Sequence, residues 1–217
     1  EAMAQQLAAI EPEKSAQLQL VMKKTGCHGF CEKGPLVVLL PQGTFYKGVK
    51  AKDVPEIIKE SILEDRVVER LLYVESSTGE RVEKYGDIEF YAKQTRVAMR
   101  NIGLIDPASL DDYLLRGGYV ALAKALSSMT PEQVMTEVSD AKLRGRGGGG
   151  FDAGRKWRSC KNSPADERFV ICNGDEGDPG AFMDRSIMEG DPHGVLEGMI
   201  LGGYPLECKQ GYIYVRQ

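Results

Sequence analysis

A glycine-rich run near the middle of the chain constrains its fold more than any other feature. It reads KLRGRGGGGF from Lys142 to Phe151, and Arg155 and Lys156 follow it. Glycine lets the backbone approach a ligand closely and adopt positive φ without steric cost. Successive backbone N–H groups can form a concave anion site, and flanking cations favour a phosphate there. The run therefore predicts a phosphate-binding loop, to which we assign Gly145, Arg146, Gly147, Gly148, Gly150, Phe151 and Lys156.

Gly145, Gly147 and Gly150 match the G-x-G-x-x-G spacing of dinucleotide-binding loops. That fingerprint requires a strand before the loop and a helix after it. Here the segment 130–142 is predicted to be helical, because it opens with a capping-box sequence, Thr-Pro-Glu-Gln. We therefore do not expect an ordinary Rossmann start. A flexible glycine linker remains the alternative for this run.

A second polar segment follows a short apolar run. Arg168–Cys172 is typical of a buried strand, and Asn173, Asp175, Glu176 and Asp178 come after it. Carboxylates accept hydrogen bonds from ribose hydroxyls, so we expect this acidic loop to bind the sugar of a nucleotide. A solvated acidic turn is one alternative. A calcium or magnesium site is another, although the spacing does not match the EF-hand loop.

At these residues the sequence resembles the NADH-binding flavoprotein subunit of respiratory complex I. It resembles even more the β subunits of soluble NAD(P)-linked hydrogenases and formate dehydrogenases, including electron-bifurcating iron–iron hydrogenases. The motifs that carry the resemblance are RGRGGGGF, then KW, NGDEGDPGAFMDR and EGDPH. It implies that FMN and NAD(H) or NADP(H) bind to the glycine-rich and acidic loops. The complex I pattern has Ala at the position of Gly149 and Glu at that of Asp178.

The resemblance also implies a function. It implies a flavoprotein subunit that exchanges hydride between NAD(P)H and FMN and passes single electrons through iron–sulfur clusters. Because cofactors carry this chemistry, no catalytic side chain is assigned. The expected partners are a small thioredoxin-like [2Fe–2S] subunit, a large hydrogenase or dehydrogenase subunit, and ferredoxin. The alternative, from another class, is a non-catalytic iron–sulfur or nucleotide-binding docking module.

Two cysteines near the N-terminus, Cys27 and Cys31, lie in the sequence GCHGFCEKGP. They are either two buried thiols or a pair of iron–sulfur ligands, since thiolates on a short turn can reach one iron. His28 is interpreted as a solvent-facing loop residue. The surrounding sequence resembles the second half of a thioredoxin-like [2Fe–2S] ferredoxin domain. The resemblance implies that the other two cluster ligands precede this sequence.

The order of expected elements indicates an α/β protein with two parts. A hairpin around Pro41-Gln42-Gly43 and a helix from Asp53 suit a partial thioredoxin-like ferredoxin domain in residues 1–75. We expect a linker with helical segments in 76–115, and the start of a Rossmann-like FMN/NADH-binding domain in 116–217. Relatives of this kind continue with the rest of the flavin fold and a [4Fe–4S] domain, so we expect part of a larger subunit.

The composition of the chain limits the kinds of molecule that it is expected to bind. The chain has 217 residues and a formal net charge of −4, which argues against nucleic acid. No apolar run reaches the roughly 18 residues that a membrane-spanning helix needs. The five cysteines are an odd number, and no export signal is visible. Together these features predict a reducing, cytoplasmic compartment.

Overall fold

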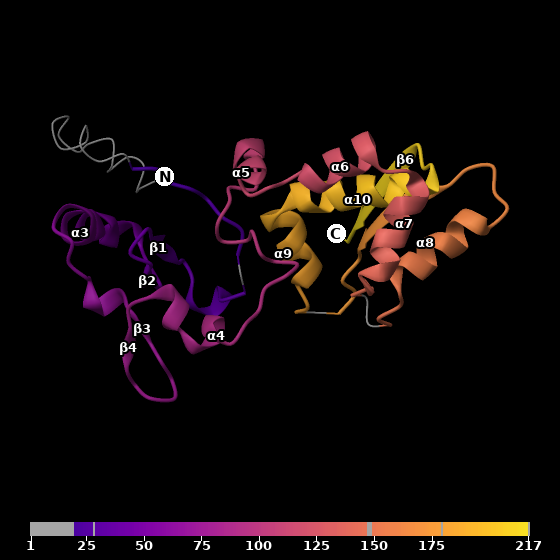
Figure 1. Cartoon of the computed structure of the whole chain (residues 1–217). Helices are drawn as coiled ribbons and strands as arrows, with labels where there is room; N and C mark the ends of the chain where they lie inside the picture. The colour runs from indigo at the N-terminus through magenta and orange to yellow at the C-terminus, as the bar shows by residue number, and fades with distance from the viewer. Residues whose placement is uncertain (1–19, 28, 147–148, 179, 217) are drawn as a thin grey trace. The chain divides into compact units, whose positions relative to one another are not determined.

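The computed structural model describes residues 20–27, 29–146, 149–178 and 180–216 (Figure 1). The chain forms two compact units. Of the described residues, the first unit contains those in 20–23 and 27–98, whereas the second contains those in 24–26 and 99–216. Each unit has its own helices and strands.

Two antiparallel hairpins form the frame of the first unit. In one, β1 (Val37–Leu39) pairs with β2 (Thr44–Tyr46). In the other, β3 (Tyr73–Val74) pairs with β4 (Arg81–Val82). The first hairpin confirms the turn predicted from the sequence, and Gly43 in that turn has a φ of +81°, which glycine adopts freely.

The polar residues 76–80 form the turn of the second hairpin. The amide of Glu75 donates to the carbonyl oxygen of Glu80 at 2.8 Å, and Gly79 donates back to Glu75 at 2.8 Å. The sequence placed a linker over 76–115, because a run of small polar residues is typical of linkers and turns alike. In the structure this segment is divided, with 76–98 in the first unit and 99–115 in the second.

A helical segment follows the first hairpin, as the sequence predicts. It consists of η2 (Ala51–Asp53), α3 (Val54–Glu56) and the wider π-helical turn η3 (Ile57–Leu63). Its start is fixed by Asp53, whose carboxylate accepts a hydrogen bond from the amide of Lys50 at 2.8 Å. Two isoleucines at the start of η3 are buried, so one face of this segment packs into the core.

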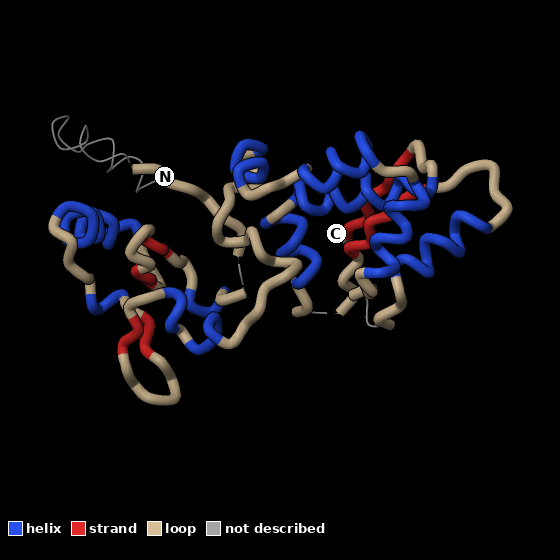
Figure 2. The backbone as a smooth tube through the Cα atoms, in the orientation of Figure 1, coloured by secondary structure: helices blue, strands red, loops and turns tan. Residues whose placement is uncertain are grey.

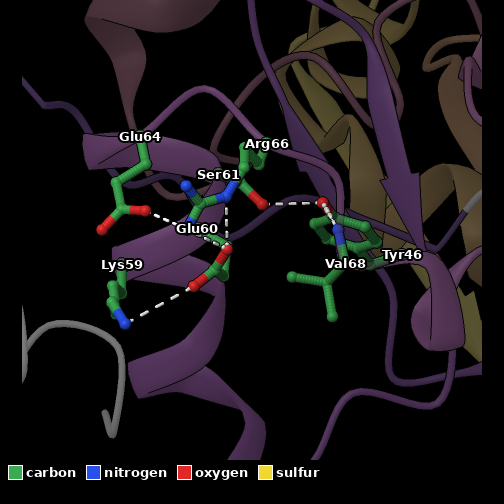
Figure 3. Close-up of polar contacts among 7 residues, drawn as sticks. All are labelled: Tyr46, Lys59, Glu60, Ser61, Glu64, Arg66 and Val68. Atoms are coloured by element: carbon green, nitrogen blue, oxygen red, sulfur yellow. Dashed lines mark hydrogen bonds and ion pairs between the residues drawn. The ribbon is translucent and has the colours of Figure 1, made fainter.

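Tyr46 at the end of β2 connects the sheet to this helical segment (Figure 3). Its ring is fully buried, and its hydroxyl lies 2.7 Å from Ser61 Oγ and accepts the amide of Val68 at 2.9 Å. Beside it, Arg66 Nε donates to Glu60 at 2.7 Å. The hydrogen bonds of the buried Tyr46 hydroxyl stabilise this region more than the Arg66–Glu60 pair does, because exposed ion pairs contribute little to stability.

An aromatic and aliphatic cluster completes the first unit. It joins the strands to η5 (Tyr85–Asp87) and α4 (Glu89–Ala92), whereas η4 (Glu69–Leu71) contributes Leu71 to the core around Tyr46. Burial of these large rings explains why 85–92 packs against the strands of the first unit. The buried members are Phe45, Tyr73, Ile88 and Tyr91.

The second unit contains a parallel pair of strands. β5 (Phe169–Gly174) pairs with β6 (Gln210–Val215), with Ile171 opposite Tyr212. Parallel strands need a long crossover, which α9 (Met183–Gly190) and α10 (Pro192–Leu206) provide. This strand–helix–strand order confirms the α/β arrangement predicted for this part of the chain.

Helix α10 is the centre of the second unit. It packs against β5 and contacts all four helices that precede the strand in this unit. Sequence signals mark several helix starts correctly: Thr130 caps its helix through Gln133, and Asp191 accepts the amide of Gly194 at 3.0 Å. The preceding helices are α5 (Leu110–Leu115), α6 (Val120–Ser128), α7 (Pro131–Asp140) and α8 (Ala153–Asn162).

A buried carboxylate joins α10 to α6. Glu197 is 7% exposed, and its carboxylate accepts the hydroxyl of Tyr113 and the amides of Tyr119 at 2.9 Å and Leu122 at 3.2 Å. It therefore caps the N-terminus of α6 from a helix about 75 residues away in sequence. No local sequence pattern indicates this cap.

None of the helices in the described part of the chain is both long enough and apolar enough to cross a bilayer.

Candidate functional site

The glycine-rich loop connects α7 to α8, so a helix and not a strand precedes it. Backbone hydrogen bonds join the two ends of the loop. The amide of Gly145 donates to the carbonyl oxygen of Phe151 at 2.8 Å, and the amide of Ala153 donates to that of Leu143 at 2.8 Å. This agrees with the prediction that the loop is not an ordinary Rossmann start. Gly147 and Gly148, which the sequence assigned to the phosphate site, lie outside the described residues.

Two arginines bind the loop's own backbone. Arg144 Nε donates to the carbonyl oxygen of Gly150 at 2.6 Å, and Arg146 donates to the carbonyl oxygen of Arg144. The guanidinium carbon of Arg155 lies 5.7 Å from the ring centre of Phe151, within the range of a cation–π contact. Cationic side chains therefore surround this loop, as the phosphate assignment requires.

An open hollow of about 610 Å³ lies along the loop. A volume of this size is within the range of roughly 300–1,000 Å³ that small-molecule sites occupy. Main-chain atoms and two arginines dominate its surroundings, which suits an anionic ligand. Its lining residues are Ala141, Lys142, Leu143, Arg144, Gly145, Arg146, Gly149 and Gly150.

Helix α8 fixes the position of the loop. Asp152 caps this helix by accepting the amide of Arg155 at 2.7 Å. Gly154 is buried, and a Cβ there would lie 2.7 Å from Cα of Ser139 in α7. The ring of Trp157 lies over Gly202 of α10. Lys156 is exposed in the first turn of α8, beside the loop. The loop thus begins and ends on packed helices.

The acidic loop follows the carboxyl end of β5. The side chain of Asn173 accepts the amide of Asp175 at 3.0 Å. Asp175 is half-buried and Asp178 is exposed, so both can meet a ligand from solvent. From the end of β6, Arg216 donates to the carbonyl oxygen of Gly177 at 3.1 Å, a contact that the sequence did not reveal.

Glu176 has a structural role that the sequence did not predict. Its carboxylate accepts the amides of Asp184 at 2.6 Å and Arg185 at 3.0 Å, so it caps the N-terminus of α9. Its own φ of +44° turns the chain toward that helix. Because each carboxylate oxygen has two lone pairs, ligand binding is compatible with this cap.

The two loops share one edge of the second unit. The glycine-rich loop precedes α8, and the chain then passes through β5 into the acidic loop. In Figure 2 both connections lie at the lower edge of this unit. In this view, therefore, the described part of the glycine-rich loop and the acidic loop lie along the same edge of the unit.

The cysteine pair lies in the first unit. The Sγ atoms of Cys27 and Cys31 are 3.1 Å apart, and both residues are exposed. The hydrogen bond between the two thiols raises the pKa of Cys31 above its ordinary value. Exposure excludes the reading of two buried thiols. His28 lies outside the described residues.

No third ligand accompanies this pair in the described part of the chain. Nowhere in that part do three or more His, Cys, Asp or Glu side chains gather as a metal site. The remaining cysteines, Cys160, Cys172 and Cys208, belong to the second unit. The described residues therefore provide at most two of the four thiolates that a [2Fe–2S] cluster takes.

Gly149 and Gly150 offer a matched pair of substitutions. Gly150 has a φ of +54°, whereas a Cβ on Gly149 would meet nothing within 4 Å. We expect Gly150→Ala to strain the loop by about 1 kcal/mol and to weaken a ligand held by it about fivefold. Gly149→Ala should bind like the parent protein. Fluorescence titration with FMN measures both, and equal affinity in the two variants would refute the role of Gly150.

Comparison with known proteins gives one family match within the second unit and similar curated proteins. Residues 138–217 match the Nuo51 FMN-binding domain. The NADP-reducing hydrogenase subunit HndC of Solidesulfovibrio fructosivorans is 51% identical over 124 residues, which cover 57% of this chain and 25% of HndC. An NADH-quinone oxidoreductase subunit of Aquifex aeolicus is 48% identical over 108 residues, covering 50% of this chain and 25% of that protein.

A solved structure matches over a longer stretch at lower identity. The crystal structure of an NAD+-reducing [NiFe]-hydrogenase in the H2-reduced state aligns with 99% of this chain and 34% of the matched chain. The identity is 24% and the TM-score is 0.41. The chain spans about a quarter of the length of the curated relatives named above.

The family match includes α8 and its glycine-rich loop, β5, the acidic loop and β6. These are the elements that place the two predicted binding loops at one edge of the second unit. Residues 138–217 of this chain therefore match the Nuo51 FMN-binding domain, and the similar curated proteins are subunits of an NADP-reducing hydrogenase and an NADH-quinone oxidoreductase.

Proposed function

We propose that this chain is part of a flavoprotein subunit that oxidises NAD(P)H, or reduces NAD(P)+, through bound FMN. The observation that carries the proposal is the shared edge of the glycine-rich and acidic loops, within a segment that matches an FMN-binding domain. Ligands of α/β sheets bind at the carboxyl ends of the strands, where this edge lies. The hydrogenase and oxidoreductase relatives support the same activity.

The residues present fit FMN. The hollow beside the loop has a suitable volume, and the arginines around it favour a phosphate. Backbone amides of the glycine-rich loop, with Lys156 beside them, would hold the phosphate. Asp175 and Asp178 would accept hydrogen bonds from sugar hydroxyls of FMN or the dinucleotide. The cap that Glu176 makes on α9 would hold the acidic loop in a fixed position relative to that helix.

FMN, when bound, couples the two-electron chemistry of nicotinamide to one-electron carriers. The protein's task is therefore to bind and orient both nucleotides, which needs no acid or base among these side chains. Packing of α8 against α7 and α10 would prevent the phosphate loop from moving away from the acidic loop. Fixed geometry of this kind is what positions two reacting groups for transfer.

The cysteine pair is proposed to hold an iron–sulfur cluster in a thioredoxin-like ferredoxin domain formed by residues 1–75. Its two thiols are exposed and 3.1 Å apart, so they fit two ligands of one iron. We propose that residues 76–115, whose first part packs within the first unit, lead from this domain to a flavin domain in 116–217. A [4Fe–4S] cluster would belong to the remainder of such a subunit.

This subunit would act in a hetero-oligomeric redox complex. The partners would be a small [2Fe–2S] subunit, a large hydrogenase or dehydrogenase subunit, and ferredoxin in a bifurcating complex. We place it in the cytoplasm, where reducing conditions keep exposed thiols such as Cys27 and Cys31 reduced.

The activity is tested by supplying NADH or NADPH with an artificial electron acceptor to the purified, FMN-reconstituted protein. We expect FMN-dependent reduction of the acceptor, because the two loops would place both nucleotides at one edge. The matched control is the same preparation with its flavin removed. A folded, flavin-loaded protein that oxidises neither nucleotide would instead indicate a non-catalytic docking module.

A further inference from the structure

Phe30 lies in the short loop between the two cysteines. Gly29 before it has a φ of +95°, which turns the chain, and Cys31 after it begins the 3-10 turn η1 (Cys31–Lys33). The carbonyl oxygen of Phe30 accepts the amide of Lys33 at 3.1 Å. The backbone on the C-terminal side of this ring is therefore fixed by the same turn that presents the Cys31 thiol.

The ring of Phe30 is held by rings from distant parts of the first unit. It stacks on Phe90 at a centroid distance of 4.8 Å and packs edge-on against Tyr91 at 5.4 Å. Tyr73 and Phe45 lie 5.2 and 6.1 Å away. Aromatic pairs at these distances are mutually attractive, so the ring is anchored on several sides.

This anchor contrasts with the cysteines that flank it. Both cysteines are exposed, whereas Phe30 is half-buried among residues of β2, β3 and α4. Burial raises the pKa of Tyr91, in keeping with its place in this aromatic cluster.

We propose that Phe30 is a positioning residue, whose ring, held in the aromatic cluster of the first unit, keeps the Cys27 and Cys31 thiols side by side. The proposal rests on the proposed cluster site for its biological meaning, but the geometry can be tested without a cluster. The segment 85–92, expected to be linker, would then take part in forming the cysteine site through Phe90 and Tyr91.

Thiol–disulfide exchange with glutathione measures how close the two thiols are held in cluster-free protein. In this reaction an S–S bond forms between Cys27 and Cys31, and the S–S bond of oxidised glutathione breaks. The two thiol hydrogens pass to two reduced glutathione molecules, so atoms and electrons balance. The exchange constant rises with the effective concentration of one thiol near the other.

We expect Phe30→Ala to lower this exchange constant about tenfold, because the loop loses its anchor. Phe30→Leu should keep most of the parent's exchange constant, because leucine fills much of the same space. Phe90→Ala should lower the exchange constant less than Phe30→Ala does. An unchanged constant in a folded Phe30→Ala variant would overturn the proposal. If circular dichroism shows that Phe30→Ala is unfolded, the exchange constant of Phe90→Ala is used instead. A value equal to that of the parent protein would then overturn the proposal.

Iron content after reconstitution separates this inference from the proposed function. Loss of iron in Phe30→Ala with rescue in Phe30→Leu supports both. If Cys27→Ser and Cys31→Ser keep all the parent's iron, the cluster assignment fails, while the exchange constant still decides the role of Phe30.

Discussion

Replacing Cys27 or Cys31 by serine is expected to remove about two iron atoms per chain, those of one [2Fe–2S] cluster, and to leave FMN in place. The thiols are exposed and adjacent, so each would be a direct ligand of the same iron. They lie in the first unit, whereas both binding loops lie in the second. Iron and flavin analysis of the reconstituted proteins measures the two effects independently.

Cys160→Ser is the matched control. Cys160 is also exposed, but it lies near the end of α8 in the second unit. This variant should keep the iron content of the parent. Iron retained in both Cys27→Ser and Cys31→Ser would contradict the ligand assignment and leave two exposed thiols without a metal role.

Glu197→Ala is expected to lower the free energy of unfolding of the second unit by about 3 kcal/mol. The substitution removes a buried acceptor from the Tyr113 hydroxyl and from the amides of Tyr119 and Leu122. Burial raises the pKa of Tyr113, so its hydroxyl stays a donor at neutral pH and would be left without this acceptor. Chemical denaturation followed by circular dichroism measures the loss.

Glu189→Ala provides the control for that measurement. Glu189 is also a helical glutamate, but it is exposed and forms only a surface ion pair with Arg185. Such pairs contribute about 0–1 kcal/mol, so the variant should unfold close to the parent. A similar midpoint and slope for Glu197→Ala and Glu189→Ala would show that the buried cap does not stabilise this unit.

Local signals in the sequence predicted much of the second unit. Thr130 and Asp191 cap the helices that they were expected to cap, because these bonds join residues three apart. The apolar run around Ile171 forms the strand before the acidic loop, but its residues alternate between exposed and half-buried, so the prediction that the strand is buried was wrong. Gly150 has the positive φ that a glycine-rich loop was expected to need.

Contacts between distant residues could not be predicted in the same way. Glu176 and Glu197 both cap helices that begin well away from them in sequence, so each resembled an ordinary acidic residue. The turn at 76–80 resembled a linker until its flanking strands were paired. The rings of Phe90 and Tyr91 pack in the first unit against Phe30 and Phe45, which are far from them in sequence.

Titration of flavin-free protein with FMN, followed by the quenching of flavin fluorescence, tests most directly whether these loops form a flavin site. We predict saturation at about one FMN per chain, with Gly149→Ala binding like the parent and Gly150→Ala binding about fivefold more weakly. Absence of saturable binding in the folded parent protein would contradict the assignment of the glycine-rich and acidic loops to FMN.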